Sequence, residues 1–361
     1  MRILVSPLDW GLGHATRLCP IIDYLKLKHD VIIAASGRGY SFYVKRYKEN
    51  LQILRIPTLP LRYGKGRRSF KLSLLFIGLK LLVNFLLDRL WLNFYLHKRK
   101  VDYIISDNRF GLFWSRSKTL FISHHLNPII PFRFKNLKKI VIKIYQSIVK
   151  KYDFVLIPDN EQESYHLTGS LSYLPNRFVV KYIGLLSRFY NLHCQEKNQY
   201  EVVAVISGLE PHRQLLLQKI TEQLKFLGYK SLIIGGKPET DFDYTQKQIR
   251  IVSHLDDEQF CAYILGARVV IARAGYSTIM DLIALGKSGI IIPTPGQTEQ
   301  EYIAQQLQDK EFFLSEYQDK LNLSKKIKEF LAKKHILEHN VSILRPTLSN
   351  FKIVFADFFR F

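Results

Sequence analysis

The residues that decide the fold are 254–304, which read HLDDEQFCAYILGARVVIARAGYSTIMDLIALGKSGIIIPTPGQTEQEYIA. Within them, the apolar run 268–272 is typical of a buried strand, and Arg273-Ala274-Gly275 forms a turn that leads into a helix. A second apolar strand, 289–293, follows that helix. A strand, a turn with glycine and a helix in this order predict a parallel sheet covered by helices.

The same alternation runs along all 361 residues. Strand candidates are 2–6, 30–35, 51–56, 102–106, 119–123, 153–157 and 179–183 in the first half, and 202–206, 231–235, 249–253, 268–272 and 289–293 in the second. Residues 187–200 are polar without a clear period, as in a linker. We therefore expect an α/β protein with two Rossmann-like domains facing a cleft, 1–186 and 201–361, whose last helix is free to pack back on the first domain.

Each half places a glycine turn between a strand and a helix. These turns are Gly11-Leu12-Gly13-His14, Ser207-Gly208 and Arg273-Ala274-Gly275. Backbone N–H groups and the positive end of the helix dipole meet at such turns and bind anions. Ligands of parallel sheets bind outside the carboxyl ends of the strands, so we expect a phosphate-bearing ligand there.

Polar side chains gather after the strands of the second half. Asp281 lies six residues beyond Gly275, where a carboxylate can accept two hydrogen bonds from a vicinal diol such as ribose. A surface acid on a capped helix is the simpler alternative for Asp281 alone. The turn 293–296, followed by Gln297, Gln300 and Glu301, adds amide and carboxylate groups at the same edge and favours a binding site.

The stretch 254–304 resembles the donor half of the GT-B glycosyltransferases, closest to the MurG-type N-acetylglucosaminyltransferases and more distantly the UDP-glucuronosyl- and plant glucosyltransferases. The residues that carry the resemblance are Asp256-Asp257 before a helix, then Arg273-x-Gly275-x-x-Thr278-x-x-acid and the Gln-containing loop. It implies a GT-B architecture and transfer of a sugar from a nucleotide-diphosphate donor, a UDP-sugar, to a hydroxyl acceptor. The implied mechanism is inverting and needs neither metal nor cofactor.

The resemblance also implies a role for single donor-side residues. Asp281 holds the ribose, the backbone of His254 and Leu255 contacts uracil, and Gln300 with Glu301 binds sugar hydroxyls. Ser207-Gly208 stands where the family has a Gly-Gly-Ser loop against the diphosphate, but Leu209-Glu210-Pro211 replaces its small residues and Arg213 would compensate. The donor set is Ser207, Gly208, Arg213, His254, Leu255, Arg273, Gly275, Thr278, Asp281, Gln297, Gln300 and Glu301.

The first glycine turn resembles the N-terminal loop of the same family, whose histidine faces the acceptor. An attacking hydroxyl must lose a proton, and an imidazole with a pKa near ~6.5 is a suitable base at neutral pH, which makes His14 the candidate. Asp107 ends the run 103–106, at the position of the aspartate that orients the base in related plant and glucuronosyl enzymes. An N-cap of the following turn is the alternative role for Asp107.

Residues 124–128, HHLNP, resemble the His-Glu-Gln-Asn stretch that lines the acceptor side in MurG-type enzymes. Only the first and last residues of that stretch match, which argues against a muramyl-peptide lipid as acceptor. Arg17 is a candidate for an acceptor phosphate, with a solvated arginine as the alternative. The acceptor side thus comprises Gly11, Gly13, Arg17, His124 and Asn127.

The formal net charge of +22 is concentrated in two segments. Residues 62–100 hold ten Lys or Arg against one acid, and 133–151 hold seven against none. Residues 70–96 are rich in Leu, Phe and Trp. Charged residues interrupt them too often to leave the ~20 consecutive apolar residues that a helix needs to span a bilayer. We expect peripheral contact with an anionic membrane surface and a lipid-linked acceptor, with a buried core helix as the alternative. No motif predicts nucleic-acid binding.

Cys19, Cys194 and Cys261 are odd in number and far apart, which predicts reduced thiols and no metal cluster. The chain starts without a secretory leader, so we expect a cytoplasmic protein, peripheral on the inner face of the cell membrane. Asp241-Phe242-Asp243 imitates a metal-binding DxD motif, but it lies in a polar loop and predicts no metal.

Three other functions stay open. A dinucleotide dehydrogenase would use Gly11-x-Gly13, but Thr16 replaces the third glycine and no acid ends the second strand, although Arg38 suits a 2′-phosphate. A sugar-nucleotide epimerase or hydrolase would share the diphosphate site. A non-catalytic protein that binds anionic membranes or nucleic acid would explain the charge but not the glycine turns.

Overall fold

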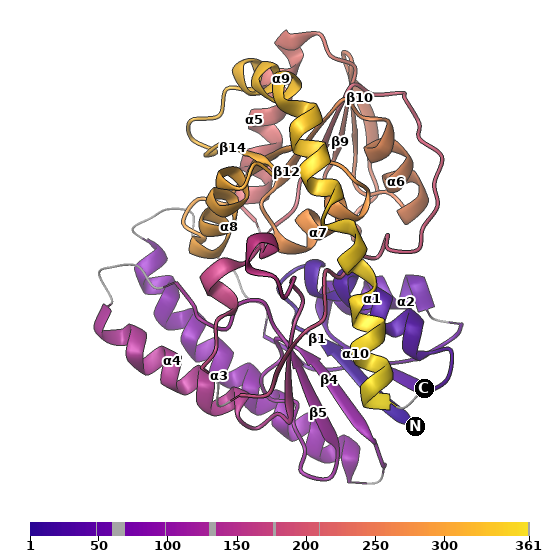
Figure 1. Ribbon diagram of the computed structural model, residues 1–361, viewed down its shortest axis with the longest axis vertical. Helices are drawn as coiled ribbons and strands as arrows, with labels where there is room; N and C mark the ends of the chain where they lie inside the picture. The colour runs from indigo at the N-terminus through magenta and orange to yellow at the C-terminus, as the bar shows by residue number, and fades with distance from the viewer. Residues whose placement is uncertain are drawn as a thin grey trace. The chain divides into compact units, whose positions relative to one another are not determined.

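The computed structural model describes residues 1–47, 49–59, 69–97, 99–129, 135–175, 178–208 and 210–359. They form two units (Figure 1): unit 1 is Met1–Leu186 with Ser349–Phe361, and unit 2 is Ser187–Leu348. Each unit is built on a seven-stranded sheet. The predicted α/β fold with two parallel-sheet domains is confirmed. Parts of both basic segments, 62–68 with Lys98 in the first and 133–134 in the second, lie outside the described residues, as does Leu209.

Unit 1 has an entirely parallel sheet in the order β3-β2-β1-β4-β5-β6-β7. Its strands are β1 (Arg2–Pro7), β2 (Asp30–Ala35), β3 (Gln52–Arg55), β4 (Tyr103–Asp107), β5 (Lys118–Ile122), β6 (Phe154–Ile157) and β7 (Val180–Tyr182). The strand order reverses between β1 and β4, where Pro7 pairs with Asp107. The loops after these two strands therefore start side by side, at the place where such sheets bind ligands.

Helices cover both faces of the unit 1 sheet. They are α1 (Gly13–Leu25), α2 (Gly37–Tyr47), α3 (Ser69–Leu96), α4 (Lys135–Val149) and α10 (Asn350–Phe359). Figure 1 shows α1, α2 and α10 on one face and α3 with α4 on the other. The last helix returns to unit 1, where the Tyr103 hydroxyl donates to the Phe358 carbonyl over 3.1 Å and Phe351, Phe355 and Phe359 are buried. Within the described residues, no helix has the length and hydropathy to cross a membrane.

Unit 2 has the strand order β10-β11-β9-β8-β12-β13-β14, with only β10 antiparallel to its neighbour. The strands are β8 (Val202–Val205), β9 (Ser231–Ile234), β10 (Asp243–Gln246), β11 (Ile249–Val252), β12 (Val269–Arg273), β13 (Ile290–Ile292) and β14 (Leu314–Ser315). The helices are α5 (His212–Leu227), α6 (Asp257–Gly266), α7 (Tyr276–Ala284), α8 (Thr298–Asp309) and α9 (Leu323–Ser342). Here the order reverses between β8 and β12, so the loops after these strands are the candidates for a ligand site.

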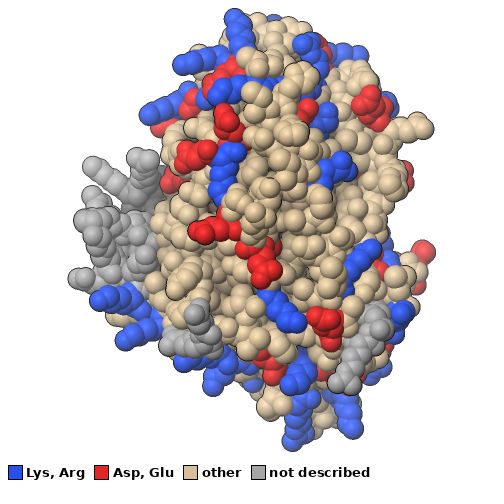
Figure 2. Space-filling model, in the orientation of Figure 1, with Lys and Arg blue, Asp and Glu red and all other residues tan. Residues whose placement is uncertain are grey.

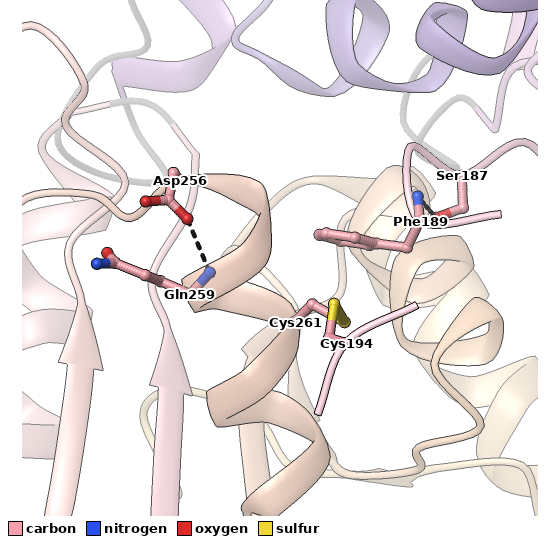
Figure 3. Close-up of a disulfide and its surroundings, with 6 residues drawn as sticks. All are labelled: Ser187, Phe189, Cys194, Asp256, Gln259 and Cys261. Carbon is pink, nitrogen blue, oxygen red and sulfur yellow. Dashed lines mark hydrogen bonds between the residues drawn. A yellow bond between two sulfur atoms is a disulfide. The ribbon is translucent and has the colours of Figure 1, made fainter. Parts of the chain in front are cut away.

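Residues 187–200 are part of unit 2 and are bonded to it along α6. Cys194 forms a disulfide with Cys261 of that helix (Figure 3). The Lys197 N–H also donates to the Ala262 carbonyl over 2.9 Å. The prediction of three reduced thiols is therefore wrong for two of them, while Cys19 is free and buried. Their separation of 67 positions along the chain concealed their proximity.

Candidate active site

His14 and Asp107 meet at the point where the unit 1 sheet reverses direction. His14 lies in the first turn of α1, and its Nδ1 is 2.9 Å from Oδ1 of Asp107 at the end of β4. A carboxylate can only accept, so Nδ1 carries the proton and donates it, which leaves Nε2 unprotonated in the neutral ring. The His14 side chain is 14% exposed whereas that of Asp107 is fully buried. The pair therefore has the arrangement of a general base held by a buried acid.

Arg17 shares the same carboxylate. Its Nε donates to Oδ2 of Asp107 over 2.7 Å, its Nη2 donates to Oδ1, and its Nη1 donates to Nδ1 of His124 over 2.8 Å. Because an arginine has no acceptor, His124 must accept at Nδ1 and is neutral, with its proton on Nε2.

The alternative of a solvated Arg17 is wrong, since only 2% of its side chain is exposed. Its guanidinium could bind an acceptor phosphate only by leaving Asp107 and His124. One helical turn separates His14 from Arg17, which places both on the face of α1 that meets the end of β4.

The charge of Asp107 is fixed by these partners. Burial alone would raise the pKa of this carboxyl, but the positive charge of Arg17 and the hydrogen bonds from Arg17 and His14 outweigh burial and lower the pKa to about 2. The carboxyl is thus ionised at neutral pH. Among the described residues the carboxylate accepts from His14 and Arg17 of α1, so the alternative of an N-cap for the following turn is not what the structure has.

Two of the remaining acceptor-side residues shape the backbone that precedes His14. Gly11 has φ = +96°, a conformation that favours glycine, and Gly13 opens α1. Asn127 instead binds within the segment after β6: its Nδ2 donates to the Ser170 carbonyl over 3.2 Å, and its backbone N–H donates to the Leu171 carbonyl. The structure therefore groups His14, Arg17, His124 and Asp107, and leaves Asn127 outside this cluster.

In unit 2 the loops after β8, β12 and β13 converge. A Cβ built on Gly275 would lie 4.0 Å from Oγ of Ser207 and 3.7 Å from Oγ1 of Thr278, and one on Gly208 would lie 4.0 Å from Oγ1 of Thr294. Helices α7 and α8 begin next to these loops, and neither has a side-chain hydrogen bond at its N-cap. By contrast, α6 is capped by Asp256 (Figure 3). The N-termini of these two helices and three hydroxyls thus surround one place at the sheet edge.

Arg273, at the end of β12, supplies a buried positive charge at the same place. Its Nη2 donates to the His212 carbonyl over 2.6 Å and its Nη1 to the Pro293 carbonyl over 3.2 Å, and the side chain is fully buried. Burial lowers the pKa of this guanidinium to about 9, so it is charged at neutral pH. Within the described residues it has no carboxylate at ion-pair distance, which leaves its charge uncompensated. A bound anion would compensate it.

Arg213 does not face this place as a free cation. Its guanidinium binds Glu210 over 2.9 Å and the Gly236 carbonyl over 2.6 Å. Glu210 also accepts from the Gln214 N–H in the first turn of α5, close in sequence to the Ser207-Gly208 loop that the resemblance places against the diphosphate. In this structure Arg213 therefore compensates for Glu210 rather than for a small-residue loop.

Asp281 is buried, so the alternative of a surface acid is wrong. Oγ of Ser187 donates to its Oδ1 over 2.6 Å, and Nε of Arg188 lies 3.5 Å from its Oδ2. Arg188 also binds Asp257 over 2.8 Å. The sequence analysis missed Ser187 and Arg188 because they stand in the polar segment interpreted as a linker. The ribose contact of Asp281 stays a prediction, with one carboxylate oxygen already bonded.

The same carboxyl makes unfolding sensitive to pH. Burial, partly offset by Arg188 and Ser187, raises the pKa of Asp281 from 3.8 to about 6. The folded state therefore binds a proton more tightly than the unfolded state, and stability from this group falls as pH rises from 4 to 6. Asp281→Asn removes that loss, so the variant should gain about 3 kcal/mol relative to the native protein between pH 4 and pH 7.

Chemical denaturation of both proteins at the two pH values checks this expectation. Ser187→Ala is the matched variant. It removes the hydroxyl that stabilises the Asp281 carboxylate, so the pH range over which stability falls should move to higher pH. A stability difference between Asp281→Asn and the native protein that does not change with pH would contradict the assignment.

The model of the glycosyltransferase family 28 C-terminal domain matches residues 214–345, within unit 2. An uncharacterized glycosyltransferase of Methanosarcina acetivorans is 23% identical over 336 residues, 86% of this chain and 82% of the relative. Another from the same organism is 27% identical over 169 residues, which span 45% of this chain and 44% of the relative, less than half its length.

Solved structures share the fold of the whole chain. The glycotransferase of kitacinnamycin has a TM-score of 0.68 at 12% identity, covering 99% of this chain and 97% of the other. The spinosyn rhamnosyltransferase SpnG, solved in complex with thymidine diphosphate, has a TM-score of 0.61 at 13% identity and covers 96% of both chains. The resemblance to the GT-B glycosyltransferases and the prediction of a glycosyltransferase are confirmed. The dinucleotide dehydrogenase and the non-catalytic binding protein are thereby set aside.

The remaining donor-side residues of this GT-B glycosyltransferase stabilise its loops. Oε1 of Gln300 accepts from the Thr294 N–H over 2.9 Å, and Oε1 of Glu301 accepts from the Gly296 N–H over 3.0 Å. Gln297 is the N-cap residue of α8. Nδ1 of His254 lies 2.9 Å from Oγ of Ser253, and Leu255 follows in the loop between β11 and α6. Contacts of these residues with uracil or sugar hydroxyls stay predictions.

The DxD-like pair of this glycosyltransferase has a different partner. Asp243 opens the exposed strand β10 and forms an ion pair with Arg250 over 2.6 Å. Over the part of the chain that the structure describes, no three His, Cys, Asp or Glu side chains are grouped as metal ligands would be.

Proposed function

We propose that this glycosyltransferase transfers a sugar from a nucleoside-diphosphate donor, a UDP-sugar, to a hydroxyl of its acceptor with inversion at the anomeric carbon. Unit 2 binds the donor, and unit 1 activates the acceptor. The observation that carries the proposal is Arg273, a fully buried cation without a carboxylate partner among the described residues, beside the turn at Gly275. The thymidine diphosphate bound by the structural neighbour SpnG supports a ligand of this class.

The donor's diphosphate would lie where the loops after β8, β12 and β13 converge. Ser207, Thr278 and backbone N–H groups at the N-termini of α7 and α8 would donate hydrogen bonds to its oxygens. Negative charge grows on the diphosphate as the bond from its oxygen to the sugar breaks. Arg273 and the helix dipoles would stabilise that charge in the transition state, which lowers the barrier to transfer.

On the acceptor side, Nε2 of His14 would take the proton of the attacking hydroxyl. The hydroxyl oxygen forms its new bond to the anomeric carbon as the diphosphate leaves from the opposite face, so configuration inverts. Asp107 would hold the ring in the required tautomer and stabilise the imidazolium that forms. Asp107 also accepts from Arg17, which fixes the position of the carboxylate that faces His14.

A screen of nucleoside-diphosphate sugars tests the proposal. The protein is incubated with UDP-, dTDP-, GDP- and CDP-sugars, with and without a lipid extract of membranes, and release of nucleoside diphosphate is measured. We expect release from a UDP-sugar that depends on the extract and yields a glycosylated lipid. Equal release without any acceptor would support a hydrolase, and an altered sugar nucleotide without release would support an epimerase. Absence of binding to every donor would contradict the proposal.

A further inference from the structure

The exposed side of α3 is apolar. Leu79, Leu82, Leu86, Leu90 and Phe94 are between 50% and 84% exposed, and their spacing of three or four residues puts them on one face of the helix. From residue 78 to residue 94, no exposed position of α3 carries a charge. A helix face that meets water is normally polar, so this face is unusual for a surface in contact with water alone.

A second apolar face, with lysines beside it, lies on α4. Ile140 and Ile144 are 54% and 57% exposed, and the exposed Lys139 and Lys143 alternate with them. Figure 2 shows Lys and Arg side chains along the lower left edge, where Figure 1 draws α4. No acidic side chain occupies an exposed position among the described side chains of the two helices.

The two helices present these faces from the same side of unit 1. Under α3 the sheet contributes Leu4 and Ile104, and under α4 it contributes Phe121 and Val155. The parallel register pairs Ile104 with Thr119, two residues before Phe121, so all of these side chains point to one face of the sheet. The exposed apolar residues 79–94 of α3, here called the apolar stripe, and the lysines of α4 can therefore meet a single surface.

We propose that unit 1 docks on an anionic lipid surface through α3 and α4. Leucine and phenylalanine side chains enter the boundary between headgroups and acyl chains, while the lysines bind headgroup phosphates. A nucleic acid would leave the apolar stripe in water. The charged side chains beside the stripe are positive, which favours an anionic bilayer as the partner. A second copy of this chain would be repelled, because its own net charge is +22.

The other side of α3 lines a pocket. Asn84 and Phe85 of α3 line it. Its other walls include Arg109 and, from the loop that leads to His14, Asp9 and Trp10. Docking would place this pocket beside the lipid surface, so the acceptor would be an amphiphile whose chain stays in the bilayer and whose hydroxyl head reaches the pocket. This part of the inference rests on the proposed function, whereas docking itself does not.

Flotation with lipid vesicles, without any donor, tests the docking. The native protein should float with vesicles of phosphatidylcholine and phosphatidylglycerol and should bind pure phosphatidylcholine more weakly. Phe94→Gln should weaken binding about tenfold, because burying one such side chain accounts for at least that factor. Phe226→Gln is the matched control, since Phe226 of α5 is also 84% exposed.

The charge is tested in the same way. Lys139→Gln with Lys143→Gln should weaken binding to anionic vesicles only, whereas Lys325→Gln with Lys328→Gln on α9 should change nothing. Native protein that floats with neither vesicle, or Phe94→Gln that floats like the native protein, would overturn the proposal. A native dimer that Phe94→Gln converts to monomers would show that a second copy covers the stripe. Because no donor is present, failure of sugar transfer would leave these results unchanged.

Discussion

His14→Gln is expected to lower kcat by about 10²–10⁴-fold, the usual contribution of a positioned general base. Gln preserves a polar side chain that can still reach Asp107, so the variant should fold. It has no group that can take a proton from the acceptor hydroxyl at neutral pH. Donor affinity should not change, because the donor is bound by unit 2. Turnover at saturating donor, together with the thermal shift caused by UDP, measures both quantities.

The matched control is His335→Gln, which changes an exposed histidine of α9 and should leave kcat unchanged. A variant that retains native turnover within a few-fold would remove His14 from the mechanism.

Asp107→Asn is expected to reduce both activity and stability. The variant leaves Arg17 buried without its carboxylate, and breaking a buried pair in this way costs about 3–5 kcal/mol. The amide can also donate to Nδ1 of His14 and favour the wrong tautomer, so kcat should fall about 10⁴-fold, as for the corresponding change in other His-Asp pairs.

The stability difference should depend on pH in a defined direction. Because the pKa of Asp107 lies near 2 when folded and near 3.8 when unfolded, its contribution is complete above pH 4 and is lost as pH falls toward 2. Denaturant unfolding at pH 7 and pH 2.5 measures this loss. Adding Arg17→Met to Asp107→Asn should restore stability but not activity. Restored activity in the double variant would contradict the role given to Asp107.

The strands were predictable because their residues are buried on both faces and form continuous Val and Ile runs, as in 202–206 and 269–273. The two strands that the sequence analysis missed lack this signal: β10 is exposed along its length, and β14 has two residues. Their positions follow from pairing with β11 and β13, which a pattern along the chain does not contain.

The candidate site was predictable where a residue's position at a strand end decides its neighbours. His14 and Asp107 follow paired strands, so the order of the sheet brings them together. Partners chosen by side-chain contacts were not predictable: Arg17 meets Asp107 across 90 residues, and Ser187 meets Asp281 across 94. Whether such a side chain bonds to another residue or to a ligand depends on how deeply it is buried, and residue type alone does not reveal burial.

The central claim is that Arg273 carries an uncompensated charge that a donor's diphosphate neutralises. Its most direct test is the thermal shift of the native protein and of Arg273→Met with UDP. At 100 times its Kd, UDP should stabilise the native protein by about 2.7 kcal/mol, while Arg273→Met, folded without ligand, should show almost no shift. An equal shift in both proteins, or no shift in the native protein with any nucleoside diphosphate, would contradict the account.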